Sequence, residues 1–352
     1  AKTSHPPILY INTDYRELYP SILIDNSHQP SVYNITYTSF SIVIHLKIKS
    51  FERKRRLKME ELPEGCIATA MSFATPGDAC KLAAVSSMFK SAAESDLLWE
   101  RFLPENYVSL ITDSSDPSLL ERFPSKKQLF LHLCDNPVLI DSGLKSFSLD
   151  KLTGKKRYML SPRDLTIVWG DTPSYWVWIP EAKSRFNEVA ELISVCWLEI
   201  RGKIKTNMLS KNTCYAAYFV FQMTTRTYGF EYYPVVVSVG LVGGEASKRT
   251  VHLDTEKIQS RRNPFLLRRR LFPRSRVPGV QIPAPAIDVE KTEDDDLKER
   301  GDGWLEVEMG EFFNWESSED EMLEMCVLEV ERGGWKGGLI VHGIEIRPKE
   351  SI

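Results

Sequence analysis

Hydrophobic and polar positions follow two periods along this chain, a helical one near the start and an alternating one farther on. Between residues 62 and 104 the apolar positions recur three and four residues apart, which is the spacing of one helix face. The clearest stripe consists of Leu82, Val85 and Phe89. Thr75 is predicted to cap that helix, with Pro76 at its first position and Asp78 in its first turn. This segment therefore predicts a compact group of helices.

From about residue 136 onward, apolar and polar positions alternate along short runs that are separated by Gly or Pro. In residues 194–204 one face carries Cys196, Leu198 and Ile200, and the other carries Trp197, Glu199 and Arg201. The exception is "RFNEVAELISV", residues 185–195, where helical spacing of the apolar positions predicts a helix. Its apolar face would consist of Phe186, Val189, Ala190 and Ile193. Many short strands with few helices predict an all-β sandwich or jelly roll.

Composition shifts divide the chain into five segments. Residues 1–58 have no clear periodic pattern, and we expect them to lie outside the functional modules. A helical module at 62–106 is followed at 107–135 by a linker, whose polar, proline-containing part is expected to be a linker or a short helix. The β-rich domain then covers 136–350. It is interrupted at about 256–298 by a long loop, first rich in Arg and Pro and then acidic, which leaves a nucleic-acid or import role open.

The overall composition is that of a globular protein with two domains and additional segments. The chain has 352 residues, 42% of them apolar and 26% charged. Its formal net charge of −3 gives no reason to expect nucleic acid as the main partner. No apolar run is long enough for a bilayer, and no secretory signal is visible, so we expect neither a membrane nor a secreted protein. The scattered cysteines are expected to be reduced, which points to the cytoplasm and nucleus.

Motifs for catalysis are missing from the sequence. It contains no phosphate-binding loop, no HExxH, no GxSxG and no Cys/His spacing typical of zinc. Paired carboxylates such as Glu306 and Glu308 fall on alternate strand positions, where a solvated face is the simpler interpretation. We therefore expect no catalytic residues, no metal and no cofactor, and a role other than that of an enzyme.

The helical segment resembles the F-box. The matching residues are Leu62-Pro63, Ile67, Ser72-Phe73, Pro76, Asp78-Ala79-Cys80, Leu82, Val85-Ser86, Phe89, Trp99 and Phe102-Leu103-Pro104. F-box modules bind the Skp-type adaptor of cullin-based ubiquitin ligases, so the resemblance implies these partners. A helical unit this small buries little apolar surface by itself, which agrees with a bound partner. The expected adaptor contacts are Leu62, Pro63, Ile67 and Val85.

The β-rich part resembles the phloem protein 2 family of plant lectins, which includes the Nictaba-type lectins. The matching stretches are "KSFSLDKLTGKKRYMLSPRDLTIVWGDTPSYWVW", "VAELISVCWLEIRGKI", "RGDGWLEVEMGEFF" and "GGLIVHGIEIRP". Members of that family bind N-acetylglucosamine oligomers and related N-glycan cores. The resemblance thus implies a multidomain protein, with an all-α F-box before an all-β lectin-like domain that reads glycans or glycoproteins.

The resemblance also implies a sugar site. A sugar ring is apolar on its C–H faces and polar at its edge, so a lectin needs an exposed aromatic plane beside polar groups. Trp169 and Trp176 match the tryptophans credited with stacking in the family, and Tyr175 is a further candidate ring. Glu319 matches a region credited with contacts to the sugar edge.

The pattern of the residues alone leaves the tryptophans open between core and ligand surface. If "SYWVW" is extended, Trp176 and Trp178 point the same way about 7 Å apart, which suits either use. Trp169 precedes the turn sequence "GDTP", so we expect it at a loop edge. Trp178 is expected in the core, and Trp197 and Trp304 are expected to be packing or rim residues.

Three functions remain compatible with the sequence. The favoured one is a ubiquitin-ligase receptor for proteins that carry N-acetylglucosamine. In the second, the lectin-like domain has lost sugar binding and captures unmodified protein through its surface or the Arg-rich loop. The third is a carbohydrate-binding stress or defence protein that acts without a ligase, against which the intact F-box pattern argues.

Overall fold

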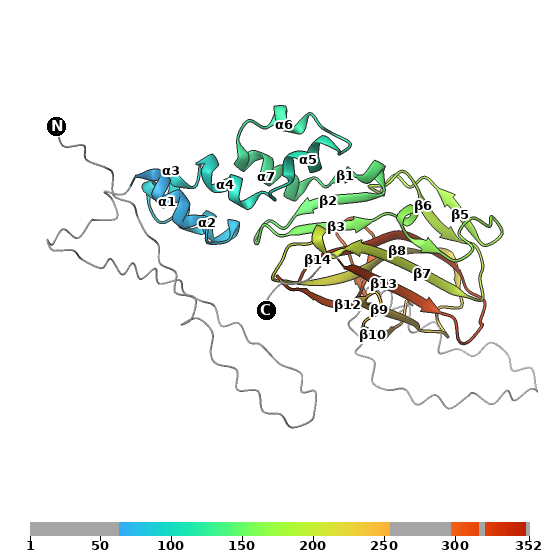
Figure 1. Cartoon of the computed structure of the whole chain (residues 1–352). Helices are drawn as coiled ribbons and strands as arrows, with labels where there is room; N and C mark the ends of the chain where they lie inside the picture. The colour runs from blue at the N-terminus through green and yellow to red at the C-terminus, as the bar shows by residue number, and fades with distance from the viewer. Residues whose placement is uncertain (1–62, 254–296, 317–320, 350–352) are drawn as a thin grey trace, which may run out of the picture. The chain divides into compact units, whose positions relative to one another are not determined.

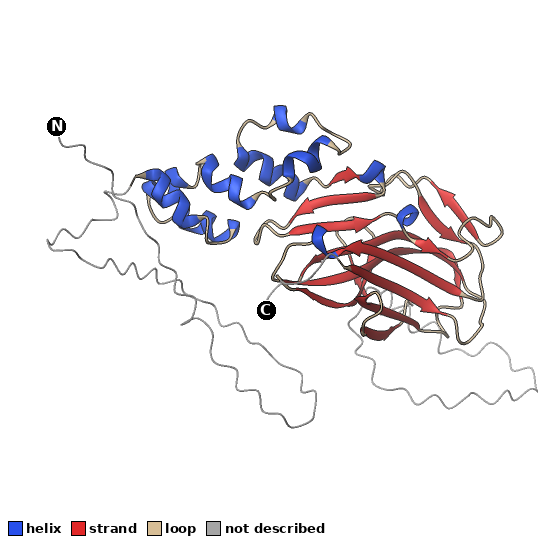
Figure 2. Cartoon of the chain, viewed as in Figure 1, coloured by secondary structure: helices blue, strands red, loops and turns tan. Residues whose placement is uncertain are grey.

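The computed structural model of the chain describes residues 63–253, 297–316 and 321–349 (Figure 1). The N-terminal segment 1–58, Leu62, Glu319 and nearly all of the charged loop at 256–298 lie outside the described residues. Helices come first in the described chain and strands follow, as Figure 2 shows. Among the described residues, no helix is long and apolar enough to cross a membrane.

The helices lie between residues 64 and 135. They are α1 (Glu64–Met71), α2 (Pro76–Ala83), α3 (Ser87–Ala92), α4 (Asp96–Phe102), α5 (Tyr107–Thr112), α6 (Leu119–Arg122) and α7 (Lys126–Asp135). The predicted start of α2 is confirmed, since the hydroxyl of Thr75 accepts a hydrogen bond from the backbone N–H of Asp78 at 3.1 Å. The segment 107–135 is more ordered than the linker prediction implies, because α5, α6 and α7 form there and bury Ile111 and Phe130 completely.

The remaining elements are short 3-10 turns and antiparallel strands. The turns are η3 (Asp141–Gly143), η4 (Pro162–Asp164) and η5 (Thr206–Met208). The strands are β1 (Val138–Ile140), β2 (Lys145–Leu149), β3 (Lys156–Leu160), β4 (Thr166–Ile167), β5 (Trp176–Ile179), β6 (Val189–Leu192), β7 (Leu198–Lys205), β8 (Thr213–Tyr228), β9 (Val235–Leu241), β10 (Ala246–Val251), β11 (Leu297–Glu299), β12 (Leu305–Asn314), β13 (Met322–Glu329) and β14 (Gly337–Pro348).

Among the described residues these strands form two sheets. The larger sheet has the order β1-β2-β3-β14-β8-β12-β11, and β6 joins it by pairing with β14 and β5. The smaller sheet has the order β10-β9-β13-β7-β4. Side chains from both sheets, among them Phe219 of β8 and Val237 of β9, belong to one buried core. The prediction of a mostly β domain after the helices is therefore confirmed, including the alternation of buried and exposed positions along β7.

The predicted helix at 185–195 is wrong, because this segment contains strand β6. Glu191 faces Ile340 of β14 on one side and Val177 of β5 on the other. Hydrogen bonding on both sides satisfies the backbone of β6 without a helix. Helical spacing over so short a run does not distinguish the two structures, since pairing with β14 is a contact between distant parts of the sequence.

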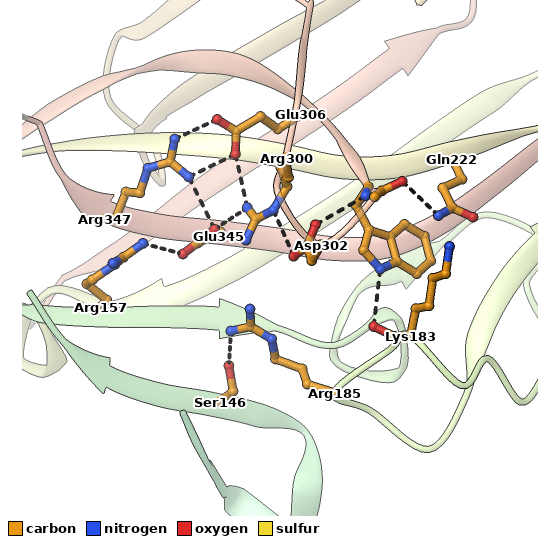
Figure 3. A network of polar contacts seen from close by, with 12 residues as sticks. Ser146, Arg157, Lys183, Arg185, Gln222, Arg300, Asp302, Glu306, Glu345 and Arg347 are labelled. Atoms are coloured by element: carbon orange, nitrogen blue, oxygen red, sulfur yellow. Dashed lines mark hydrogen bonds and ion pairs between the residues drawn. The ribbon is translucent and has the colours of Figure 1, made fainter. Parts of the chain in front are cut away.

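A buried ionic network joins β3, β12, β14 and the residue after β11 (Figure 3). Glu345 pairs with Arg157 at 3.0 Å, with Arg347 at 3.3 Å and with Arg300. Arg347 also pairs with Glu306 at 2.6 Å. Burial alone would raise the pKa of Glu345, but the three guanidinium groups outweigh burial and hold that pKa at about 2. Glu345 is thus ionised at neutral pH, and the ion pairs of the network tie these strands together.

Candidate functional site

The site starts where the chain leaves β4. The N–H of Val168 donates to the carbonyl of Glu199 at 3.0 Å, so the pairing of β4 with β7 continues to this residue. Trp169 then has a φ of 58°, which lies in the left-handed region. A bulky residue rarely adopts that conformation, and such strain gathers at functional positions. The side chain of Trp169 is 44% exposed.

The turn after Trp169 is held from both ends. The N–H of Thr172 donates to the carbonyl of Trp169 at 2.9 Å. The indole N–H of Trp178 donates to the carbonyl of Gly170 at 3.0 Å. The guanidinium of Arg163 stacks over the Trp178 ring, 3.5 Å from its centroid, and Arg163 is paired with Glu188 at 2.6 Å. These contacts give the loop that carries Trp169 a defined shape.

Trp169 and Tyr175 meet across this turn. Their ring centroids are 5.2 Å apart, and the rings are inclined by 38°. Tyr175 is partly buried and packs against the core, so its ring contact connects the exposed indole to the interior. The structure thus brings these two of the predicted sugar-site residues together as one aromatic surface.

Trp176 does not take part in this surface, which corrects the prediction. Its side chain is only 2% exposed and belongs to the core. It faces Leu192 of β6, which is 1% exposed, so the side of β5 that carries Trp176 is turned to the interior. Trp178 is partly buried and packs against the same core, in line with its prediction. Burial leaves no indole face of Trp176 on which a sugar ring could stack.

Two exposed tryptophans that were not predicted as site residues lie on neighbouring segments. Trp197 is 41% exposed and Trp335 is 55% exposed. Val195 and Lys336 exchange backbone hydrogen bonds of 2.9 and 2.8 Å, so the segments that carry the two tryptophans run side by side. The signal for Trp335 is its setting in "GGWKGG", where a large apolar residue stands among glycines in a turn.

Polar groups accompany Trp197. The indole N–H of Trp197 donates to the carboxylate of Glu199 at 2.9 Å, and Arg201 donates to the same carboxylate at 2.7 Å. The hydrogen bonds from Arg201 and Trp197 lower the pKa of Glu199 from its ordinary value, against a smaller opposing effect of burial. Glu199 is therefore an ionised acceptor beside the indole of Trp197.

The predicted adaptor contacts differ in how far they are buried. Pro63 is exposed, and Val85 is 69% exposed. Ile67, in contrast, is 4% exposed and packs inside the helical part. Phe73 at 73% and Leu97 at 65% exposure add two large apolar side chains that were not predicted as contacts. These exposed side chains are available to a partner, whereas Ile67 is not.

Within residues 63–253, 297–316 and 321–349, no three His, Cys, Asp or Glu side chains are grouped so that they could hold a metal ion. The cysteines are present as free thiols, and burial raises the pKa of the Cys134 thiol to about 12. The arrangement suits recognition of a flat or extended ligand by aromatic rings.

Comparisons with known proteins agree on one family. Residues 155–348 match the phloem protein 2 family. F-box protein PP2-B1 of Arabidopsis thaliana is 43% identical over 315 residues, which cover 84% of this chain and 92% of the relative. F-box protein PP2-B10 of the same plant is 42% identical and covers 85% of this chain and 99% of its own. F-box protein PP2-B15 is 41% identical, with coverages of 82% and 96%.

Solved structures add nothing to this picture. A β-(1,4)-mannanase of Podospora anserina has 9% sequence identity and a TM-score of 0.27, and the match covers 55% of this chain and 28% of that chain. A likeness at this level supports no statement about fold or function.

Proposed function

Because the chain belongs to the phloem protein 2 family and to the plant F-box proteins that carry this domain, we propose that it is the substrate receptor of a cullin-based ubiquitin ligase. In this role the helical part binds the Skp-type adaptor. The β domain binds glycans that contain N-acetylglucosamine on the protein to be ubiquitinated. The chain is then a non-catalytic receptor that works in the cytoplasm and nucleus.

The observation that carries the sugar half of the proposal is the conformation of Trp169. Its backbone is held at a φ of 58° and its ring is 44% exposed beside Tyr175. Strain of this kind costs about 1–3 kcal/mol, and exposing an indole forgoes the benefit of burying it. An indole fixed at this cost and open to solvent fits a ligand with an apolar face, and the C–H face of a pyranose is such a ligand.

The adaptor half of the proposal rests on the exposed apolar side chains of the helices. Pro63, Phe73, Val85 and Leu97 are exposed although each would gain free energy from burial. A partner that covers them supplies this burial. Ile67 serves the same surface indirectly, because it holds α1 in place from inside.

One observation favours a second candidate. Of the two tryptophans that the family resemblance assigns to stacking, Trp176 is buried. A receptor whose lectin-like domain has lost sugar binding and captures unmodified protein is consistent with that burial. The two candidates differ in the ligand of the β domain and share the adaptor half.

The test is a glycan array with the full chain, followed by titration with chitin oligomers. Binding that is lost in Trp169→Ala supports the sugar receptor, and absence of binding to any glycan overturns it in favour of the second candidate. Retention of the full chain on immobilised Skp-type adaptor, and its loss in Val85→Asp, supports the ligase half. If the unaltered chain does not bind the adaptor, the ligase half is wrong.

A further inference from the structure

We propose that Arg185 and Arg157 form a binding site for a phosphate group on the face of the larger sheet that carries the ionic network, with the hydroxyl of Ser146 as a third donor. The ligand is a phosphate monoester or the free phosphate ion. The site is separate from the loop of Trp169, and it does not depend on the proposed sugar binding.

The carboxylates of the ionic network are already in use. The network consists of the carboxylates of Asp302, Glu306 and Glu345 and the guanidinium groups of Arg157, Arg300 and Arg347. Both oxygens of Glu345 are engaged, Oε1 by Arg157 at 3.0 Å and Oε2 by Arg347 at 3.3 Å. Asp302 accepts hydrogen bonds from Arg300 at 3.2 Å and from the backbone N–H of Trp304 at 3.1 Å. A further cation beside this network therefore lacks a carboxylate of its own.

Arg185 is that further cation. It lies in the segment 180–188 between β5 and β6, and Figure 3 shows its side chain reaching toward Ser146 on β2. Nη1 of Arg185 donates to the hydroxyl of Ser146 at 3.2 Å. This is its one hydrogen bond among the described residues, where it forms no ion pair. A guanidinium has five N–H donors, and Arg185 is partly exposed, so a ligand can reach donors that are not yet bonded.

Arg157 lies on the same face of the sheet as Ser146. Ser146 and Ser148 are two residues apart on β2, so their side chains point to one face. Ser148 pairs with Arg157 of β3, and the side chains of directly paired residues share a face. Within the described part of the chain, Arg157 bonds to Glu345 through Nη2, its Nε is buried without a partner, and 29% of its side chain is exposed. Two incompletely bonded guanidinium groups therefore lie on one face.

The surroundings of Arg185 have an excess of positive charge. Burial lowers the pKa of Arg185 from its ordinary value, Glu345 opposes this shift and Arg300 adds to it, although the group stays charged at neutral pH. The ring of His342 lies 5.9 Å from that of Phe186, the residue after Arg185. His342 is 1% exposed, and neither of its nitrogens has a hydrogen-bond partner among the described residues. Burial, with the charges of Arg185 and Arg300, lowers its pKa to about 3. An anion beside Arg185 would offset this excess.

A phosphate group suits these donors better than a carboxylate does. It has three strong acceptor oxygens and close to two negative charges near neutral pH. The donors come from three places, the segment 180–188, β2 and β3, so each can bond to a different oxygen. A guanidinium binds phosphate through two parallel hydrogen bonds. The hydroxyl of Ser146 accepts from Arg185 and keeps its own proton to donate.

The experiment is calorimetric titration of the full chain with inorganic phosphate at constant ionic strength, which keeps the screening of surface charges equal throughout. We expect saturable binding by the unaltered chain and a roughly tenfold loss of affinity in Arg185→Gln. Titration with O-phosphoserine distinguishes a phosphate group on a larger molecule from the free ion. Acetate should bind more weakly than phosphate, and equal binding of the two would overturn the assignment to phosphate.

Arg226→Gln is the matched control, because it removes the same charge at a distance. Arg226 is exposed on β8, eight residues beyond Tyr218, which pairs with Glu345. Eight residues of strand span roughly 26 Å. The affinity for phosphate should be unchanged in this variant. Equal losses in Arg226→Gln and Arg185→Gln would mean that phosphate responds only to net charge, which overturns the site.

Thermal unfolding distinguishes ligand contact from a structural role. Without phosphate, Arg185→Gln should unfold at the same temperature as the unaltered chain or a higher one, since it removes a charge that lacks a partner. Phosphate should raise the unfolding temperature of the unaltered chain and have little effect on the variant. A variant that is less stable without phosphate and gains as much from it as the unaltered chain would show that Arg185 is structural only.

The phosphate site and the sugar site can fail separately. Binding of chitin oligomers should be unchanged in Arg185→Gln, and binding of phosphate should be unchanged in Trp169→Ala. An unaltered chain that does not bind phosphate overturns the phosphate site and leaves the proposed sugar receptor standing.

Discussion

The indole of Trp178 donates a hydrogen bond of 3.0 Å to the carbonyl of Gly170, and so connects strand β5 to the loop that carries Trp169. Trp178 packs against the core with the rest of its ring. One residue thus serves both the interior of the β domain and the shape of the candidate site. The loop adopts its conformation because a buried element holds it.

Replacing Trp178 by Phe should keep the aromatic ring under Arg163 and remove the donor to Gly170. We expect a loss of about 1 kcal/mol in unfolding free energy, the usual net value of one hydrogen bond. Sugar affinity should fall by the factor that corresponds to about 1 kcal/mol, because the loop of Trp169 loses one of the hydrogen bonds that hold it. Denaturant unfolding and titration with chitin oligomers measure the two effects. An unchanged affinity would show that the loop keeps its shape without this bond.

Trp169 and Trp176 should respond to substitution in opposite ways. Trp176→Ala removes a ring that is 2% exposed and should cost about 3–5 kcal/mol in unfolding free energy. Trp169→Gly removes an exposed ring and relieves a φ of 58°, so the stability should stay equal or rise by about 1 kcal/mol while sugar binding is lost. Thermal unfolding and titration of both variants check this. A Trp169→Gly protein that still binds sugar would contradict the proposed site.

Val85 and Ile67 separate binding from folding in the helical part. Val85 is 69% exposed, so Val85→Asp should leave the unfolding free energy within about 0.5 kcal/mol and abolish retention on the Skp-type adaptor. Ile67 is 4% exposed, and Ile67→Ala should cost about 2–5 kcal/mol in stability. Thermal unfolding curves measured together with the pull-down distinguish a loss of adaptor binding from a loss of stability. Equal adaptor binding by Val85→Asp and the unaltered chain would place the contact elsewhere on the helices.

The features that the sequence predicted well are those set by neighbouring residues. The cap at Thr75 and the alternation along β7 each depend on a few adjacent positions. Strand β6 was predicted as a helix because its identity depends on pairing with β14, about 150 residues later in the chain, which no local period records. The predicted general class, helices followed by a mostly β domain, is correct despite this error, because the other strands show clear alternation of apolar and polar positions.

The candidate site was predicted only in part, because some of its features depend on neighbouring residues and others on distant strands. Trp169 could be placed at a loop edge because "GDTP" is a turn sequence, and the structure has it exposed there. Trp176 lies in the same aromatic stretch as Trp169, but its sequence neighbours do not reveal its burial. Which side of β5 faces the core depends on the partner strand β6. The segments of Trp197 and Trp335 are brought together by the bridge between Val195 and Lys336, which is a contact between distant parts of the sequence. Residues brought together by sheet register were the ones that sequence reasoning missed.

Lys336 and Glu329 should show the energetics of a buried ion pair. Their side chains are 0% and 3% exposed. Lys336→Met leaves an uncompensated carboxylate in the interior, and we expect a cost of about 3–5 kcal/mol in unfolding free energy. Adding Glu329→Leu should recover much of that loss, since two apolar groups replace the pair. Denaturant unfolding of the single and double variants forms the comparison. The Nζ of Lys336 also donates to the carbonyls of Gly334 at 2.7 Å and Cys196 at 3.4 Å. A double variant that is as unstable as the single one would mean that Lys336 acts chiefly through these two hydrogen bonds.

His342 should make the stability of the β domain fall in mild acid. It is 1% exposed, stacked on Trp304 at 4.1 Å between ring centroids, and neither ring nitrogen has a hydrogen-bond partner among the described residues. Burial, together with the positive charges of Arg185 and Arg300, lowers its pKa to about 3. The carboxylates of Asp302 and Glu345 oppose this shift and are outweighed.

The sign of the effect follows from proton binding. The ordinary pKa of the ring is 6.5, so between pH 6.5 and about 3 the unfolded chain binds a proton that the folded protein does not. Stability is therefore complete above pH 6.5 and decreases as the pH falls through this window, by about 2 kcal/mol at pH 5. Glu345 adds to the loss only at lower pH, since its pKa moves from 4.5 to about 2 on folding. Denaturant unfolding at pH 7 and pH 5 should show this decrease in the unaltered chain and a decrease smaller by about 2 kcal/mol in His342→Phe, which keeps the stacked ring and cannot bind a proton. If both proteins lose the same free energy between the two pH values, His342 is not the group responsible.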